Sequence, residues 1–408
     1  MSEQPGYHRD GYLHEMNVDV RAIEESEGRR FARLSDSLLY PGGGGQPPDR
    51  GRLGDVPIVG AARDEKSLRC EIVGDASLEP GEATLQLDWP RRFDHMQQHS
   101  AQHLLTAVAA DRFGWPTTSF HLHELASGSP CDIEVDAQSI SDEALTDLED
   151  AVAAEIRAGR LISDRRVSTA EFEAPEVRNR VRTRGLPAGH TGDVRLVEIE
   201  GIDLAACGGT HLRSTSEIGG LKLLGVEKLR GGLRLTWVAG RRVRQRLGDH
   251  EKRAAELRRL FGAADSEIAG VAAGKLDQLK ALDRQNRRLQ SQVAELTAET
   301  LKASGAAFVE RHFDGANLNL LGQLARTICD DASTQTAFFT GQDDSGGYLL
   351  LSTGGATAVD VQALGREIAP LLEGRGGGSG RIFQGRAGSF DRRDEALRLI
   401  SNAVESAQ

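Results

Sequence analysis

The first 88 residues alternate short apolar runs with polar turns. Glycine, proline and aspartate separate the runs, which lie at 13–20, 31–34, 56–59, 68–72 and 85–87. Short strands with this punctuation are typical of small all-β domains. We therefore expect residues 1–88 to form a small β-barrel.

Residues 89–240 alternate helical with strand-like patterns. Met96, Leu104, Leu105 and Val108 mark an amphipathic helix over 93–110. Ser141 is a good N-cap for a second helix that continues through Arg157. Strand-like runs occupy 119–123, 194–204, 218–224 and 233–238. This stretch predicts a domain of mixed helices and strands.

Residues 241–303 have the pattern of long helices. Apolar positions alternate at spacings of three and four through Leu279, Leu282, Asn286, Leu289, Val293 and Leu296. This is a heptad seam, and a polar residue inside such a seam fixes its register. Gly270 and Gly274 would allow the chain to reverse, so we expect an antiparallel helical hairpin. A straight coiled coil between two chains is the competing interpretation.

Residues 304–408 resemble a further α/β unit. Strand runs near 337–340 and 348–352 alternate with helices near 321–330 and 359–372, and a last helix begins near Asp391. A glycine-rich stretch, 374–388, precedes that helix. It lacks the Gly-Lys-Ser/Thr ending of a nucleotide P-loop. Its glycines and the side chains of Arg375, Arg381 and Arg386 suit contact with a phosphate backbone, and a plain flexible loop is the alternative.

Length and composition limit the number of domains, the cellular location and the class of partner. A chain of 408 residues indicates about two to four domains. It contains no apolar run long enough for a membrane span and no secretory signal, and its four cysteines are widely spaced. We therefore expect a cytoplasmic protein without a disulfide framework. The net charge of −11 argues mildly against a nucleic-acid partner, but basic runs at 178–184 and 241–246 leave that partner open.

Two short motifs suggest a metal site. His99 and His103 lie four apart, so they share one face of the first helix. Cys207-Gly-Gly-Thr-His211 follows a strand-like run, and its glycines permit a tight turn that brings the thiolate and the imidazole together. Three imidazoles and one thiolate suit Zn²⁺, which prefers four nitrogen and sulfur ligands in a tetrahedron. We expect one zinc ion per chain.

A third motif, Leu39-Tyr-Pro-Gly-Gly-Gly-Gly-Gln46, lies within the expected barrel. Consecutive glycines are entropically unfavourable, so their use indicates a place where the backbone approaches a ligand closely. A flexible hairpin loop is the alternative. We take Gly43, Gly44, Gly45 and Gln46 as candidate substrate-binding residues.

The residues around these motifs carry a family resemblance. Asp94-His-Met-Gln-Gln-His99-Ser-Ala-Gln-His103, paired with Ala206-Cys207-Gly-Gly-Thr-His211, resembles the editing domain of alanyl-tRNA synthetases. It resembles still more closely the freestanding alanyl-tRNA editing proteins of the AlaX type. The glycine motif and the C-terminal stretch are similar to this family too, and the latter looks like its DHHA1 domain, although Arg381-Ile-Phe-Gln384 departs from the usual pattern there.

The resemblance implies an α+β multidomain fold and an activity. The expected parts are the β-barrel (1–88), a zinc-containing editing domain (89–240), the helical hairpin (241–303) and a DHHA1-like domain for tRNA binding and dimerisation (304–408). In the family, the positions matching His99, His103, Cys207 and His211 bind zinc. The implied reaction is hydrolysis of serine, and possibly glycine, wrongly esterified to tRNA(Ala), without ATP. A homodimer through the C-terminal domain is also implied.

An editing site must hydrolyse the serine ester and leave the correct alanine ester intact. The serine side chain differs from that of alanine only by a hydroxyl group, so we expect a group that hydrogen-bonds this hydroxyl near the zinc. Gln98, Gln102, Thr106 and Thr210 are candidates, although glutamine on a helix usually faces solvent. His95 is expected at the helix surface or behind the ligands. His121 and His123 fit one strand face, with an ordinary half-buried strand favoured over a pocket role.

Two other functions remain open from the sequence. Four protein ligands describe a closed, structural zinc site, so the chain could be a zinc-stabilised tRNA-binding or dimerisation protein without hydrolytic activity. Threonyl-tRNA synthetases share the zinc motifs, so another aminoacyl-tRNA could be the substrate.

Overall fold

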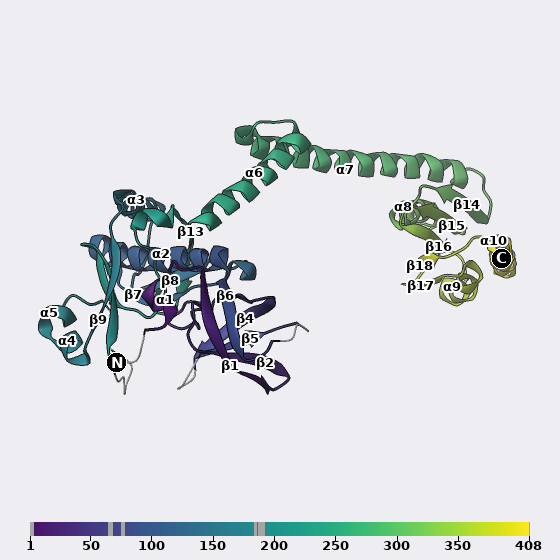
Figure 1. Cartoon of the computed structure of the whole chain (residues 1–408). Coiled ribbons are helices and arrows are strands. Elements are labelled where there is room, and N and C mark those ends of the chain that lie inside the picture. The colour runs from purple at the N-terminus through teal and green to yellow at the C-terminus, as the bar shows by residue number, and fades with distance from the viewer. Residues whose placement is uncertain (1–3, 64–67, 75–77, 183–185, 187–191, 408) are drawn as a thin grey trace. The chain divides into compact units, whose positions relative to one another are not determined.

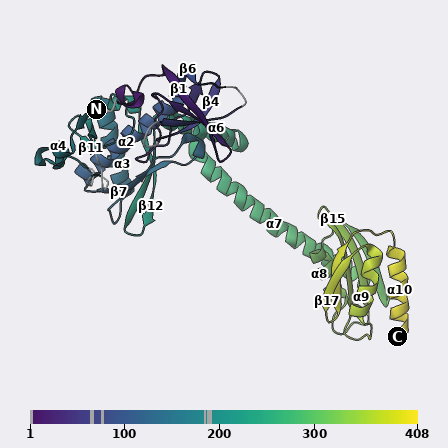
Figure 2. The ribbon, with the colours of Figure 1, turned by 60° about the horizontal axis from the view of Figure 1, so that its bottom comes forward.

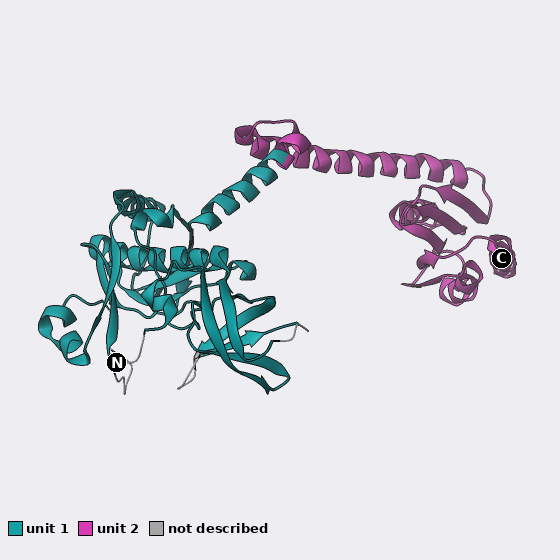
Figure 3. Cartoon of the chain, viewed as in Figure 1, with its two compact units in different colours: residues 1–255 teal, residues 256–408 magenta. Residues whose placement is uncertain are grey.

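The computed structural model describes residues 4–63, 68–74, 78–182, 186 and 192–407. The chain divides into two compact units, residues 1–255 and 256–408 (Figure 3). Among the described residues, no helix combines the length and apolar character that a membrane span requires.

The N-terminal part of the first unit is the predicted β-barrel. Its strands close in the order β1-β2-β5-β4-β3-β6 (Figure 1). They are β1 (Glu15–Ser26), β2 (Arg29–Leu34), β3 (Gly51–Leu53), β4 (Val56–Arg63), β5 (Leu68–Ile72) and β6 (Gly81–Leu87), and α1 (Gly6–Arg9) precedes them. Alternating side chains such as Val18, Val20, Leu85 and Leu87 fill the barrel interior. The sequence pattern missed β3, which is only three residues long.

The rest of the first unit is built around the long helix α2 (Trp89–Phe113). The Asp88 side chain caps its first turn, Pro90 follows at the second position, and Gly114 ends it with a φ of 68°. The predicted Ser141 cap is confirmed on the second helix, where its side chain accepts from the Ala144 N–H. The other helices of this part are α3 (Asp142–Ala158), α4 (Thr169–Glu173) and α5 (Pro175–Arg178).

Two small sheets pack against α2. One has the strand order β12-β13-β8-β7 and the other β11-β10-β9. Their strands are β7 (Thr117–His121), β8 (Cys131–Val135), β9 (Ile162–Val167), β10 (Val194–Ile199), β11 (Asp203–Ala206), β12 (Leu221–Leu229) and β13 (Gly232–Ala239). The single strand expected over 194–204 is wrong, because a turn at 200–202 folds it into the β10–β11 hairpin. That hairpin directs the second metal motif back toward α2.

Buried ion pairs join the elements of the first unit. Arg92 of α2 pairs with Asp49 of the barrel, and both side chains are fully buried. Arg242, at the start of α6 (Arg241–Phe261), pairs with Asp94 of α2 at 2.7 Å. Breaking a buried pair on one side typically costs about 3–5 kcal/mol. These pairs therefore fix the barrel and α6 firmly to the helix that carries the metal motif.

The long helical segment breaks at a different place from the one predicted. Gly262, with a φ of 64°, ends α6, and α7 (Asp265–Lys302) then runs without interruption through Gly270 and Gly274 (Figure 2). The expected reversal at those two glycines is therefore wrong. The antiparallel hairpin itself stays a prediction.

The second unit contains the predicted α/β domain. Its sheet has the order β14-β15-β16-β18-β17, and α7 and α8 pack on one face while α9 and α10 pack on the other. The elements are β14 (Phe308–Asp314), α8 (Leu318–Ile328), β15 (Thr336–Asp343), β16 (Gly346–Thr353), α9 (Val361–Ile368), β17 (Arg375–Ser379), β18 (Ile382–Ala387) and α10 (Arg393–Ser406). The glycine-rich stretch is thus a β-hairpin, so the flexible-loop alternative is wrong.

Candidate metal centre

The four predicted metal ligands lie together in the first unit. His99 and His103 project from one face of α2, and Cys207 and His211 come from the turn after β11. One ligand atom from each residue lies within 4.8 Å of all the others. Gly209 allows this approach, because a Cβ there would lie 2.2 Å from the His99 ring.

The distances fit a tetrahedral zinc site. Cys207 Sγ lies 3.4 Å from His99 Nε2 and 3.3 Å from His211 Nε2. Ordinary Zn–N and Zn–S bonds at tetrahedral angles separate such atoms by about 3.5 Å. The donor set and its spacing therefore suit zinc.

Each imidazole is held through its Nδ1 atom. His99 Nδ1 donates to Gln46 Oε1 at 2.8 Å, and His103 Nδ1 donates to Asp203 Oδ2 at 2.8 Å. His211 Nδ1 lies 3.2 Å from the hydroxyl of Ser100. With Nδ1 engaged, the Nε2 lone pair of each ring faces the centre, which is the usual arrangement around a bound metal.

The electrostatics of the cluster favour a thiolate. Burial alone raises the pKa of Cys207, but the positive charge that His99 and His211 can carry and the hydrogen bonds of the imidazoles bring it well below its usual value. Burial and His99 lower the pKa of His211 to about 3. Burial opposes the charged form of His103 too, yet its hydrogen bonds to Asp203 and Cys207 raise its pKa to about 10. The thiolate and neutral His211 are in the form that binds metal, and His103 would release its Nε2 proton when the ion binds.

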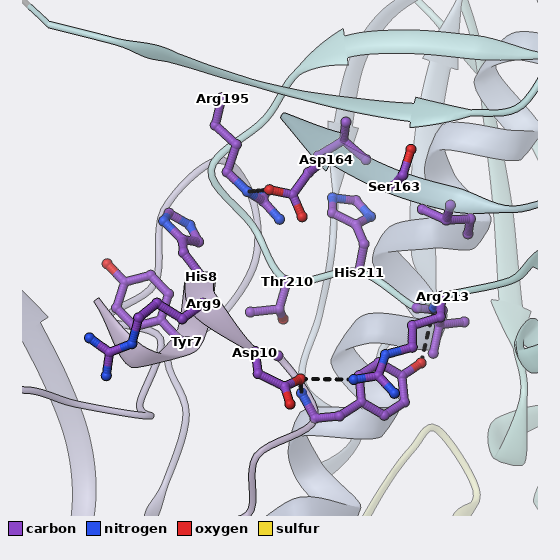
Figure 4. A pocket seen from close by; sticks show the side chains of 15 residues that line it. Tyr7, His8, Arg9, Asp10, Ser163, Asp164, Arg195, Thr210, His211 and Arg213 are labelled. Atoms are coloured by element: carbon purple, nitrogen blue, oxygen red, sulfur yellow. Dashed lines mark hydrogen bonds and ion pairs between the residues drawn. The ribbon is translucent and has the colours of Figure 1, made fainter. Parts of the chain in front are cut away.

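The backbone of residues 207–210, called here the metal loop, is held by Arg195 and His8, whose side chains Figure 4 shows with Asp164. Arg195 Nη1 donates to the carbonyls of Cys207 (3.0 Å) and Gly209 (2.7 Å), and Asp164 fixes the guanidinium. His8 Nε2 donates to the Gly208 carbonyl at 2.9 Å. Burial and the charge of Arg195 lower the pKa of His8 to about 4, so its ring is neutral at pH 7. The cavity on this side, of about 330 Å³, is lined by these residues and by Thr210 and His211.

A second cavity opens on the inner side of the metal loop. It has a volume of about 280 Å³, and His99, His103 and Cys207 line it. Polar side chains of α2 and β7 line its far wall. Thr117 and Gln102 both hydrogen-bond to Thr106 Oγ1, at 3.1 and 2.9 Å. Gln102 is only 4% exposed, and its Oε1 atom has no partner among the described residues.

Residues of the glycine motif line the inner cavity and hydrogen-bond to a candidate metal ligand. Gly44 lines the inner cavity. Gly45, at a φ of 82°, packs against Phe120 so tightly that a Cβ would lie 2.5 Å from the ring. Gly43 and Gln46 close a tight turn, and the Gln46 side chain binds His99 and Thr210. The structure thus brings Gly44 and Gln46 of this motif next to the candidate metal ligands.

Other predicted residues lie elsewhere. His95 is buried at 2% exposure near Asp49, so the expectation of a surface position is wrong. Gln98 is buried as well and bonds to the backbone of Ala239. His121 and His123 flank Asp132 outside the inner cavity, in a network that includes Arg234 and Glu134. Arg184, from the first basic run, lies outside the described residues.

The C-terminal arginines are in the second unit, on or next to the β17–β18 hairpin. Arg375 is exposed, Arg381 pairs with Asp331, and Arg386 lies over the ring of Tyr348 at 4.9 Å. Their role in tRNA binding stays a prediction.

Several residues of the centre were not predicted. Asp203 carried a signal, because it is the only charged residue in the apolar run Ile202–Ala206. Ser100 lies inside the first motif. No sequence signal marked His8 or Arg195, because only the folded structure brings these residues to the metal loop.

Part of the chain that contains Cys207 and His211 matches a known family. Residues 194–236 match the family described as the threonyl and alanyl tRNA synthetase second additional domain. This stretch of the chain therefore belongs to a domain type found in threonyl- and alanyl-tRNA synthetases.

Full-length relatives narrow this class. The alanyl-tRNA editing protein Aarsd1 of Mus musculus is 35% identical over 98% of this chain and 97% of its own length. The alanyl-tRNA editing protein AlaX-L of Pyrococcus horikoshii is 25% identical over 93% of each chain. An alanine–tRNA ligase of Methanoculleus marisnigri is 27% identical over 96% of this chain but only 42% of its own. The chain belongs to the family of freestanding alanyl-tRNA editing proteins.

Proposed function

We propose that this protein hydrolyses the ester of serine wrongly attached to tRNA(Ala). One observation carries the proposal: three imidazoles and a thiolate, each imidazole held through Nδ1, converge beside a cavity of about 280 Å³. The names of the relatives support the tRNA substrate. His99, His103, Cys207 and His211 would hold zinc. Zinc bound there would supply a Lewis acid for the ester carbonyl or an attacking water.

Selection of serine is assigned to Gln102. Gln102 lines the inner cavity, its buried Oε1 atom has no partner among the described residues, and its Nε2 atom donates to Thr106 Oγ1. A hydroxyl of the substrate can donate to that oxygen, whereas alanine cannot. Sites that hydrogen-bond a substrate hydroxyl discriminate strongly against its absence.

The change of Gln102 to Leu tests this assignment. The variant keeps the size of the side chain but removes the acceptor, so the ratio of kcat/KM for Ser-tRNA(Ala) over Ala-tRNA(Ala) should fall by about 10- to 100-fold. An unchanged ratio in a folded, zinc-containing variant would remove Gln102 from the specificity site. Gln138, an exposed glutamine on a loop, offers the matched control.

We further propose that the second unit binds tRNA and pairs with a second copy of the chain. The exposed Arg375, with Arg381 and Arg386 nearby, supports phosphate contacts. On α7 the seam residues Leu279, Leu282, Leu289, Val293 and Leu296 are 51–66% exposed. The neutral Gln278, Gln285 and Gln292 flank this seam at intervals of seven, so two copies would meet there without like-charge repulsion.

A structural role for zinc is the second candidate. Four protein ligands are typical of closed zinc sites, and this coordination favours a tRNA-binding protein without hydrolytic activity. Deacylation assays with Ser-, Gly- and Ala-tRNA(Ala) separate the two functions. Hydrolysis of the serine ester with the alanine ester spared supports editing. Tight tRNA binding without any hydrolysis supports the structural alternative.

A further inference from the structure

The three peptide groups of the metal loop are oriented alike. The carbonyls of Cys207, Gly208 and Gly209 accept hydrogen bonds from Arg195 or His8 on the outer side of the loop. In a trans peptide the N–H points opposite to the carbonyl, and the described chain has no cis peptide bonds. The N–H groups that follow these carbonyls therefore point inward, toward the metal ligands.

Two of the three inward N–H groups have partners. Gly209 N–H donates to Cys207 Sγ at 3.4 Å, and Thr210 N–H donates to Gln46 Oε1 at 3.0 Å. The third, the N–H of Gly208, has no hydrogen-bond partner among the described residues. Gly208 lines the inner cavity together with His99, His103 and Cys207. A fixed, unused donor thus faces the space beside the ligands.

We propose that the Gly208 N–H is an oxyanion-hole donor for the ester carbonyl, and that His8 and Arg195 are the positioning residues that aim it. The inference rests on the proposed hydrolytic function. A donor already oriented before the reaction stabilises developing charge without reorganisation, which is why such groups are effective.

The step balances as an ordinary ester hydrolysis. The oxygen of water bonds to the carbonyl carbon, and the π electron pair moves onto the carbonyl oxygen, which accepts the Gly208 N–H. When the carbonyl re-forms, the bond to the ribose oxygen breaks, and a proton from the water ends on that oxygen. The products are the free amino acid and the tRNA hydroxyl.

His8 suits the positioning role because its tautomer is fixed. The Gly208 carbonyl can only accept, so His8 Nε2 carries the proton, and His8 Nδ1 accepts from Arg166 at 3.1 Å. The ring comes from the N-terminal α1, far from the metal motifs in sequence. The N-terminal segment thereby contributes to the active centre without touching substrate.

A pair of variants at one position tests the donor. Gly208→Pro removes the N–H, whereas Gly208→Ala keeps it, and an added Cβ there meets no atom within 4 Å. We expect the kcat of G208P on Ser-tRNA(Ala) to lie about 100-fold below that of G208A, with similar KM and zinc content. Equal kcat values in the two zinc-containing variants would overturn the proposal.

Binding of two inert analogues gives a readout apart from activity. A seryl-adenosine phosphonate presents a tetrahedral anion, and the corresponding amide presents a neutral carbonyl. Affinity for the phosphonate should be at least about 10-fold weaker in G208P than in G208A, while affinity for the amide should match. Equal loss for both analogues would indicate a distorted cavity and count against the proposal.

If G208P does not retain zinc, variants of His8 test whether the Gly208 N–H acts as an oriented donor. His8→Ala frees the Gly208 carbonyl, whereas His8→Gln keeps a donor for it. Phosphonate affinity and kcat should fall in H8A and recover in H8Q, both with zinc bound; equal values in H8A and wild type would overturn the positioning role. A wild-type protein that hydrolyses no aminoacyl-tRNA would instead refute the proposed function itself.

Discussion

Gln46 links the glycine motif to both halves of the metal centre. Its Oε1 atom accepts from the Thr210 N–H as well as from His99, and its Nε2 atom donates to Thr210 Oγ1 at 2.8 Å. Because the backbone N–H requires an oxygen, the amide orientation is fixed, and with it the tautomer of His99. One side chain from the barrel therefore prepares a ligand on α2.

Removal of this link should weaken metal binding. We expect Gln46→Ala to lower zinc affinity by about 10- to 100-fold, because partners that orient a ligating histidine usually contribute that much. Competition with a fluorescent chelator measures it. Gln138→Ala, on an exposed loop, is the control, and an equal affinity in Q46A and Q138A would contradict the role of Gln46.

His95 makes stability depend on pH. Burial, and then the charges of Arg91 and Arg242, lower its pKa from 6.5 to about 3. The unfolded chain therefore takes up a proton first as the pH falls, and the folded state loses stability from about pH 6.5 downward. This contribution is fully present above pH 6.5.

The change of His95 to Gln should flatten that dependence. Between pH 7 and pH 5 the wild type should lose up to about 2 kcal/mol more than H95Q in urea unfolding. His250→Gln, at an exposed position on α6, is the control. An identical pH profile in H95Q and wild type would contradict the assignment.

At the residue scale the sequence predicted that the four candidate ligands converge, because they sit in two compact motifs. It could not predict His8 or Arg195, since nothing local distinguishes them from surface residues. Gln102 was expected to face solvent, but it is only 4% exposed and lies beside the inner cavity.

Among the elements, α7 is unusual in having two apolar faces. Ala294 and Ala298 on one face are buried against the C-terminal domain, which leaves the Leu279–Leu296 seam on another face exposed. The sequence predicted the seam from its spacing.

The seam should control assembly. We expect Leu282→Glu combined with Leu289→Glu to shift the chain from dimer to monomer in sedimentation at micromolar concentration, because the charges would meet in the seam. Ala281→Glu with Arg288→Glu places the same side chains beside the seam as the control. A wild-type monomer, or a double variant that stays dimeric, would rule out this interface.

The sequence predicted elements better than their boundaries. The Ser141 cap of α3 is confirmed, whereas α2 begins at Trp89 and ends at Phe113, outside the predicted range 93–110. The helix break was misplaced, because Gly262 ends α6 with a left-handed conformation while Gly270 and Gly274 are tolerated inside α7. β17 has no alternation to detect, since three of its five residues are glycine.

At the scale of the whole molecule, the centre depends on segments drawn from most of the first unit. Gln46 comes from the barrel, His8 from the N-terminal segment, His99 from α2 and Cys207 from the turn after β11. Motifs predicted the ligands, but the convergence of the remaining parts required the fold. Chelation should therefore destabilise the first unit as a whole.

The most direct test of the central claim is deacylation of Ser-tRNA(Ala) by the same preparation in zinc-loaded, chelator-stripped and zinc-restored form, with Ala-tRNA(Ala) assayed in parallel. We predict hydrolysis of the serine ester that disappears with zinc and returns with it, while the alanine ester is spared. Undiminished hydrolysis by folded, zinc-free protein, or no hydrolysis by the zinc-loaded protein, would contradict the account.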